Sequence, residues 1–184
     1  IGLLGGSFDP PHAGHVHITR EALKRFELDQ VWWLVSPGNP LKSNGPAPLQ
    51  ARMKAARALM DHPRVRISDF ETRVGTRHTA DTLAALQAHY RSDRFVWLMG
   101  ADNLVQFAAW KDWKKIAETV VFAIFDRPGY SDAALASEAA TVFRDHQIPD
   151  EQAAELATRI APAWTFIRET KNPLSSTEIR RKKL

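Results

Sequence analysis

The sequence predicts an α/β fold: a Rossmann-like doubly wound parallel sheet with helices on both faces. Short apolar runs rich in Val, Ile, Phe and Trp alternate along the chain with longer stretches of helical period. Such alternation favours a parallel sheet that is covered on both sides through right-handed crossovers. A glycine-rich turn also follows the first apolar run, which is where these folds bind their ligands. With 184 residues, we assign residues 1–184 to a single domain.

The expected elements follow in order from the start of the chain. Apolar runs predict the strands, and stretches of helical period predict the helices. The Pro- and Gly-rich stretch 36–48 is too short for an interdomain linker, so it is interpreted as an active-site loop. The expected strands are 1–4, 31–35, 65–70, 95–99, 120–125 and 164–168. The expected helices are 14–26, 49–61, 79–90, 110–118, 131–146 and 150–160.

Composition narrows the classes of protein. A hydrophobic fraction of 44% with 9% aromatic residues indicates a folded globular protein. The sequence has no apolar stretch near the roughly 20 residues that span a bilayer, and we expect neither a membrane partner nor a secretory leader. The absence of cysteine excludes disulfides and thiolate chemistry. We therefore predict a cytoplasmic location.

The net charge of +4 raises the question of nucleic-acid binding. Most basic residues, such as Arg20, Lys24 and Arg25, alternate with acidic ones, as on a solvated helix face. The run at 180–183 lies at the very end of the sequence. We therefore expect small anionic substrates and no nucleic-acid partner. A non-catalytic basic nucleic-acid-binding module is the alternative from another class.

The most informative motif is the segment 5–15, GGSFDPPHAGH, which follows the first predicted strand. Gly5 and Gly6 allow the backbone to approach a ligand closely, because no Cβ intervenes. His12 and His15 lie at the start of a helical pattern, where unpaired N–H groups and the helix dipole suit phosphate. Imidazoles add further donors. The segment predicts a nucleotide-phosphate cradle.

Two alternatives apply to these motifs. Histidines three residues apart are also half of a metal site, but the sequence lacks cysteine and a nearby carboxylate pair, so we expect no protein-held metal. The segment 175–180, SSTEIR, follows the last predicted strand, and Ser175 with Glu178 fits a simple helix capping box. Arg180 adds a guanidinium that pairs well with phosphate, so the segment is also a candidate second phosphate site.

Both segments resemble known signatures. The first resembles GG(S/T)FDPxHxGH of the nucleotidyltransferase superfamily, and SSTEIR resembles the second signature of that superfamily. Together with their separation, they resemble the bacterial nicotinate mononucleotide adenylyltransferases over nearly the whole chain. The resemblance implies that Ser176, Thr177 and Arg180 hold the phosphates of ATP opposite His12 and His15.

Shorter stretches extend the resemblance. TADTL at 79–83 is similar to a helix start in that family, and RPGY at 127–130 matches a family stretch. In the segment GADNL at 100–104, the resemblance implies that Asp102 contacts a ribose hydroxyl, whereas from the residues alone Asp102 caps a helix. In WKDW at 110–113, it implies that Trp110 stacks on the pyridine ring, while Trp113 fits the core.

The resemblance implies transfer of the AMP moiety of ATP to nicotinate mononucleotide, giving nicotinate adenine dinucleotide and pyrophosphate in NAD biosynthesis. Mg²⁺ is expected to arrive with the ATP phosphates. Nicotinamide mononucleotide, phosphopantetheine or glycerol phosphate are alternative acceptors. Backbone N–H groups around 77–79, at a helix start, favour a carboxylate over an amide and hence the nicotinate form.

The predicted site residues form three groups, and two departures concern the mononucleotide side. The sequence has Arg77-His78-Thr79 where the family commonly has Ser-Tyr-Thr, and Leu41-Lys42 where it often has His-Lys. The predicted catalytic residues are His12, His15, Lys42 and Arg180. Predicted ATP-binding residues are Gly5, Gly6, Ser7, Phe8, His15, Gly100, Asp102, Ser176, Thr177 and Arg180. Predicted mononucleotide-binding residues are Asn39, Lys42, Arg77, Thr79 and Trp110.

Overall fold

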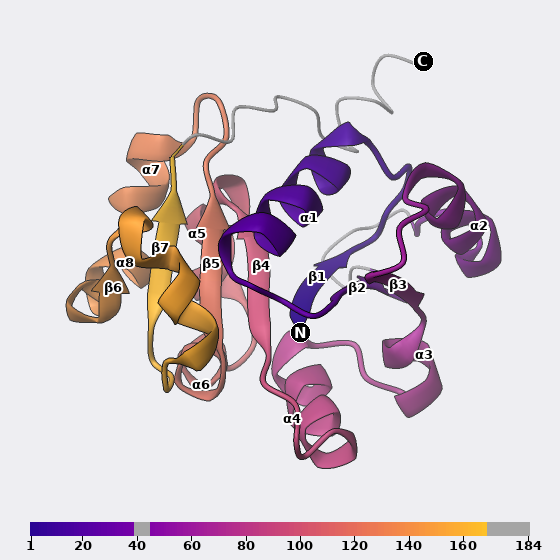
Figure 1. Ribbon diagram of the computed structural model, residues 1–184. Helices are drawn as coiled ribbons and strands as arrows, with labels where there is room; N and C mark the ends of the chain where they lie inside the picture. The colour runs from indigo at the N-terminus through magenta and orange to yellow at the C-terminus, as the bar shows by residue number, and fades with distance from the viewer. Residues whose placement is uncertain (39–44, 169–184) are drawn as a thin grey trace.

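The computed structural model describes residues 1–38 and 45–168. Parallel strands form a seven-stranded sheet in the order β3-β2-β1-β4-β5-β7-β6, with β3 and β6 at its two edges (Figure 1). This sheet confirms the predicted Rossmann-like α/β class. The strands are β1 (Gly2–Gly6), β2 (Val31–Val35), β3 (Val65–Ser68), β4 (Val96–Gly100), β5 (Val121–Phe125), β6 (Gln147–Ile148) and β7 (Trp164–Ile167).

Helices connect the strands along the chain. The α-helices are α1 (Ala13–Arg25), α2 (Leu49–Leu59), α3 (Phe70–Val74), α4 (Thr79–His89), α5 (Ala101–Gln106), α6 (Trp113–Thr119), α7 (Ser131–Leu135) and α8 (Glu138–Val142). Three 3₁₀ helices are described as well: η1 (Phe107–Ala109), η2 (Arg144–His146) and η3 (Asp150–Thr158).

Buried side chains on both faces of the sheet explain why its strands are continuously apolar. Successive residues of a strand point to opposite faces, so Leu3 joins one core cluster and Leu4 the other. The first cluster packs against α4, α5, η1, α6 and α8, and the second packs against α1, α2 and η3. Figure 1 shows α1 in front of the sheet. The prediction of helices on both faces is therefore correct.

Several predicted elements differ from the structure. The helix predicted over 131–146 is interrupted, because Ser137 accepts a hydrogen bond from Ala140 N–H and caps a new helix, α8. The helix predicted over 150–160 is a 3₁₀ helix. The strand predicted over 65–70 ends at Ser68, whose hydroxyl accepts from Phe70 N–H at the start of α3. The helix predicted from residue 110 begins at Trp113. The helix expected to begin at Asn103 is α5, which begins at Ala101. Neither α3 nor β6 was predicted from the sequence.

The direction of the crossovers reverses next to β1. This strand pairs with β2 on one side and with β4 on the other, and both pairings are parallel. The chain moves outward to β2 and β3, then returns to β4 on the opposite side of β1. In open α/β sheets this reversal leaves a crevice beyond the carboxyl ends of the two strands. By this rule the expected binding crevice lies between the segments that follow Gly6 and Gly100.

Candidate active site

The loop after β1 ends in a pair of imidazoles that cap α1. His12 is the N-cap residue, and its Nδ1 accepts a hydrogen bond from Gly14 N–H at 3.1 Å. In return, His15 Nδ1 accepts from His12 N–H at 3.1 Å. The two ring centroids are 3.8 Å apart. The sequence therefore builds a capping box from two histidines, where Ser or Thr and Glu or Gln are usual.

This capping arrangement selects one tautomer of each ring. Because Nδ1 of both His12 and His15 accepts a backbone hydrogen bond, the neutral ring carries its proton on Nε2. In this tautomer each ring serves the helix cap with Nδ1 and carries its N–H donor on Nε2. Donors fixed in this way are suited to an anionic ligand at the helix N-terminus.

The ring of His15 lies in an aromatic enclosure. Its centroid is 4.6 Å from that of Phe8 and 5.7 Å from that of Trp33, while Phe8 and Trp33 are stacked at 4.8 Å. Burial lowers the pKa of His15 to about 3, and the nearby His12 and Arg127 act in the same direction, partly opposed by the hydrogen bond with the His12 backbone. Without a ligand, His15 is therefore a neutral donor at physiological pH.

The carboxyl end of β4 places a carboxylate and a guanidinium beside the same crevice. Asp102 lies in the first turn of α5, and its Oδ2 accepts from Arg127 Nη1 at 2.6 Å. The helix begins at Ala101 with Gly100 as its N-cap, so the interpretation of Asp102 as the cap is wrong. Arg127 is not among the predicted site residues, although RPGY at 127–130 matches a family stretch.

Two glycines at this crevice are closely packed. A Cβ on Gly5 would lie 2.8 Å from Cη2 of Trp97, a buried residue of β4. A Cβ on Gly100 would lie 2.5 Å from Oδ1 of Asp102. A Cβ on Gly5 would press on a buried core indole, whereas a Cβ on Gly100 would meet the end of a flexible carboxylate that can move. Close approach therefore requires glycine more strictly at position 5 than at position 100.

Of the described residues predicted for the mononucleotide, Arg77 precedes the N-cap of α4, Thr79 belongs to α4, and Trp110 precedes α6. Thr79 is the first residue of α4, whose N-cap His78 makes no side-chain capping bond. Trp110 is partly buried, with its ring centroid 5.4 Å from that of Phe107 and 6.5 Å from that of Trp97. Lys111 Nζ contacts Asp81 Oδ2 at 3.3 Å and joins the two segments.

A buried carboxyl supports the turn before α4. Glu71 on α3 is buried, and its Oε1 accepts from Thr82 Oγ1 at 3.2 Å. The Thr82 hydroxyl also reaches His78 O at 3.1 Å and Thr76 Oγ1 at 2.9 Å. Burial raises the pKa of Glu71 to about 7, and the hydrogen bond with Thr82 partly opposes this rise.

Comparisons with known proteins agree with these motifs. The family model described as cytidylyltransferase-like matches residues 3–182. A probable nicotinate-nucleotide adenylyltransferase of Ruegeria pomeroyi is 60% identical over 181 residues, which is 98% of this chain and 84% of that protein. Its namesake in Cereibacter sphaeroides is 58% identical over 180 residues, covering 98% and 95%. This chain belongs to the nicotinate-nucleotide adenylyltransferase family.

Solved structures support the fold of this family member. The Plasmodium falciparum nicotinic acid mononucleotide adenylyltransferase complexed with NaAD has a TM-score of 0.74 at 18% identity, covering 98% of this chain and 82% of that one. The Vibrio parahaemolyticus protein described as a putative nicotinate-nucleotide adenylyltransferase has a TM-score of 0.53 at 20% identity, covering 86% and 97%. At these identities the similarity establishes the fold alone.

Several predicted residues lie outside the described part of the adenylyltransferase chain, and their roles stay predictions: Asn39, Lys42, Ser176, Thr177 and Arg180. Across residues 1–38 and 45–168, no group of three or more His, Cys, Asp or Glu could hold a metal ion. In the same ranges, no helix is long and apolar enough to cross a bilayer.

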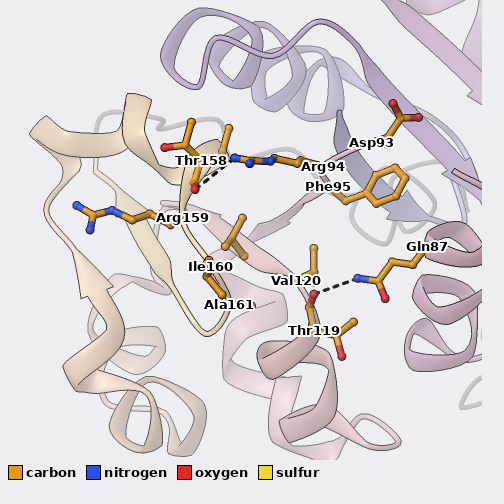
Figure 2. A pocket seen from close by; sticks show the side chains of 12 residues that line it. Gln87, Asp93, Arg94, Phe95, Thr119, Val120, Thr158, Arg159, Ile160 and Ala161 are labelled. Atoms are coloured by element: carbon orange, nitrogen blue, oxygen red, sulfur yellow. Dashed lines mark hydrogen bonds between the residues drawn. The ribbon is translucent and has the colours of Figure 1, made fainter. Parts of the chain in front are cut away.

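A second hollow lies at the opposite end of the sheet (Figure 2). It has a volume of about 260 Å³ and is lined near the amino ends of β4 and β5 by Phe95 and Val120, among others. Arg94 donates to Thr158 O at 3.5 Å at its rim, and Gln87 donates to Thr119 O at 3.2 Å. The described residues that line it include no predicted site residue. The crevice beyond β1 and β4 is therefore the candidate active site.

Proposed function

We propose that this chain transfers the AMP moiety of ATP to nicotinate mononucleotide, releasing pyrophosphate and forming nicotinate adenine dinucleotide for NAD biosynthesis. The observation that carries the proposal is the histidine capping box beside Gly5 and Gly6, at the crevice between β1 and β4. Membership of the nicotinate-nucleotide adenylyltransferase family supports the choice of substrates. We further propose that residues 1–184 act as one nucleotidyltransferase domain.

The two imidazoles stabilise the charge that develops on the phosphates. A phosphate oxygen of the mononucleotide attacks the α-phosphorus of ATP, a new P–O bond forms, and the bond from the α-phosphorus to the pyrophosphate leaving group breaks. Such transfer depends on positioning and on neutralising charge more than on covalent catalysis. His12 donates from Nε2 between the attacking and attacked phosphates, and His15 binds ATP together with the backbone of Gly5, Gly6 and Ser7. Lys42 and Arg180 supply the remaining positive charge that neutralises the phosphates in this proposal.

The carboxyl end of β4 binds the nucleoside part of ATP. Asp102 accepts a hydrogen bond from a ribose hydroxyl, and Gly100 leaves room for the carboxylate above the strand end. Arg127 holds that carboxylate by a short ion pair whose partners are 16% and 24% exposed. A guanidinium–carboxylate hydrogen bond of this kind fixes geometry as well as charge. Arg127 therefore positions Asp102 for the ribose.

The amino end of α4 and Trp110 bind the mononucleotide. Because His78 does not cap α4 with its side chain, the first-turn N–H groups are available to the carboxylate of nicotinate. Asp81 in that turn would repel a carboxylate, but Lys111 pairs with it at 3.3 Å. Trp110, fixed edge-on by Phe107 and Trp97, offers a face to the pyridinium ring. These features favour the acid over the amide.

Mg²⁺ belongs to the ATP substrate in this proposal. The described residues there offer imidazole, backbone N–H and guanidinium groups, which suit phosphate oxygens, and the carboxylate of Asp102 is paired with Arg127. Mg²⁺ prefers carboxylate, phosphate and water oxygens. The ion is therefore held mainly by phosphate oxygens and water. Bound there, it withdraws charge from the triphosphate and assists departure of pyrophosphate.

The proposal is tested by incubating the protein with ATP, Mg²⁺ and nicotinate mononucleotide and separating the products by chromatography. We expect equimolar nicotinate adenine dinucleotide and pyrophosphate. Parallel reactions with nicotinamide mononucleotide, phosphopantetheine and glycerol phosphate compare kcat/KM among acceptors. Equal kcat/KM for the acid and the amide would overturn the preference for nicotinate. Absence of pyrophosphate with every acceptor, together with binding to RNA, would favour the nucleic-acid-binding alternative.

A further inference from the structure

A buried arginine contacts the backbone of the loops that follow β1 and β2. Arg52 belongs to α2 and is 3% exposed. Its Nη1 donates to Ser7 O at 2.6 Å and to Ser36 O at 2.8 Å, and its Nε donates to Ala47 O at 2.7 Å. One guanidinium thus joins three separate segments of backbone.

Two of these segments leave the sheet at the ends of β1 and β2, and the third leads into α2. Ser7 follows β1 and precedes the capping histidines, while Ser36 follows β2. The two strands are joined at this point, since Ser36 N–H donates to Gly6 O at 2.9 Å. Ser36 and Ala47 flank the loop sequence that contains Asn39 and Lys42. Ala47 N–H also donates to Asp9 Oδ2 at 3.2 Å, which ties it to the loop after β1.

A cation in this place has a large desolvation cost that an apolar side chain would avoid. Its value lies in geometry, because the rigid fork of donors on a guanidinium reaches several carbonyls in fixed directions. A lysine ammonium is a compact point charge and lacks that fork. The arrangement therefore calls for arginine specifically and for more than a positive charge.

We propose that Arg52 is a positioning residue that sets the ATP-binding loop after β1 at a fixed distance from the loop after β2. The inference rests on the proposed function, since it assigns the first loop to ATP and the second to the phosphate of the mononucleotide. Transfer between two phosphates depends steeply on their separation, and small displacements remote from the reacting atoms reduce rate by about 100-fold. Arg52 touches neither phosphate in this proposal.

The test compares Arg52→Met and Arg52→Lys with Arg57→Met, a matched control on the exposed side of the same helix. At a temperature where all variants are folded by circular dichroism, we expect Arg52→Met to lower kcat about 10- to 100-fold and to raise the KM for the mononucleotide about tenfold. The KM for ATP should change less, because the capping box of α1 remains. Arg52→Lys should fall between wild type and Arg52→Met, and Arg57→Met should match wild type.

Hydrogen exchange of the ligand-free protein provides a readout that does not require activity. Peptides covering Ser7, Ser36 and Ala47 should exchange faster in Arg52→Met, with unchanged exchange in β5 and β7. If the wild type forms no dinucleotide, the proposed function fails while the exchange comparison still tests the loop junction. With an active wild type, two outcomes overturn the positioning role. In the first, Arg52→Met keeps kcat and both KM values. In the second, Arg52→Met loses kcat and both substrate affinities equally, and hydrogen exchange is raised throughout the protein.

Discussion

The two strand ends that border the crevice present their helices in different ways. After β1, residues 7–12 separate the strand from α1, and the helix is capped by His12 and His15 from its own sequence. After β4, α5 begins at the next residue, Ala101, and its N-cap Gly100 has no side chain. The polar contact at this second end comes from Arg127, 25 residues along the chain.

The difference separates two ways of placing charge near a ligand. At β1 the donors are neutral imidazoles held by local hydrogen bonds, so their geometry depends on the first turn of α1. At β4 the carboxylate of Asp102 is held across the fold, so its geometry depends on the packing of the segment after β5. Variants at β1 should therefore change turnover, and variants at β4 should change the affinity for ATP.

His12 gives the largest expected effect. His12→Asn keeps a side-chain oxygen that can cap α1 but removes the Nε2–H donor, and His12→Ala removes both. Loss of a donor to the developing charge lowers turnover by about 100- to 1,000-fold, and we expect at least that for both variants. ATP binding by calorimetry should survive in His12→Asn. Near-normal turnover in His12→Asn would contradict the role of Nε2.

Arg127 should affect ATP affinity more than turnover. Arg127→Met leaves Asp102 without its short ion pair, and a hydrogen bond to a charged group contributes about 1.5–3 kcal/mol. We therefore expect the KM for ATP to rise about 10- to 100-fold while kcat falls less. The control is Arg159→Met, which removes an ion pair with Glu155 whose side chains are 46% and 54% exposed. Equal KM values for the two variants would refute the positioning of Asp102.

The low pKa of His15 makes the first strand end sensitive to acid. Its folded-state pKa of about 3 lies below the ordinary value of 6.5, so between these values the unfolded chain binds a proton that the native state excludes. The free energy of unfolding is therefore highest above pH 6.5 with respect to this group, and it falls by about 2 kcal/mol when the pH is lowered to 5. His15→Gln keeps a capping-box residue and should lose less stability between pH 7.5 and pH 5 in denaturant titrations.

The exposed His146 is the control for that titration. His146→Gln should keep the acid sensitivity of the wild type, because its ring is not enclosed by Phe8 and Trp33. An equal loss of unfolding free energy in His15→Gln and wild type would show that another group is responsible.

Gly5 and Gly100, one glycine at each strand end, give the smallest effects and test the comparison directly. Gly5→Ala presses on the buried indole of Trp97, and overpacking of this kind costs about 1–3 kcal/mol of unfolding free energy. Gly100→Ala presses on the movable carboxylate of Asp102, so stability should change less while the KM for ATP rises. Thermal melts and ATP titrations separate the two. A larger stability loss in Gly100→Ala would reverse the assignment.

Local signals explain what the sequence could predict. The glycine pair, the histidines and the start of α1 lie within a few residues of one another, so their spacing was sufficient to predict a strand, a loop and a helix start in this order. The phosphate cradle stays a prediction. The sheet was predictable because strands buried on both faces are continuously apolar.

Other features depend on contacts between distant parts of the chain. Arg127 joins Asp102 across 25 residues, and Arg52 joins Ser7 across 45, so neither pairing has a local signature. The helix predicted over 131–146 failed because one hydroxyl, that of Ser137, starts a new helix inside an alanine-rich stretch. Trp110 was expected inside a helix, but Phe107 and Trp97 hold it in extended backbone before α6.

Glu71 has a practical consequence for handling the protein. Its native-state pKa of about 7 exceeds the ordinary value of 4.5, so the native state keeps a proton that the denatured chain releases in mildly acidic buffer. The contribution of Glu71 to the free energy of unfolding falls as pH rises from 4.5 to 7. At alkaline pH the ionised carboxylate of Glu71 is buried between α3 and α4. Purification slightly below neutrality should therefore preserve the turn before α4.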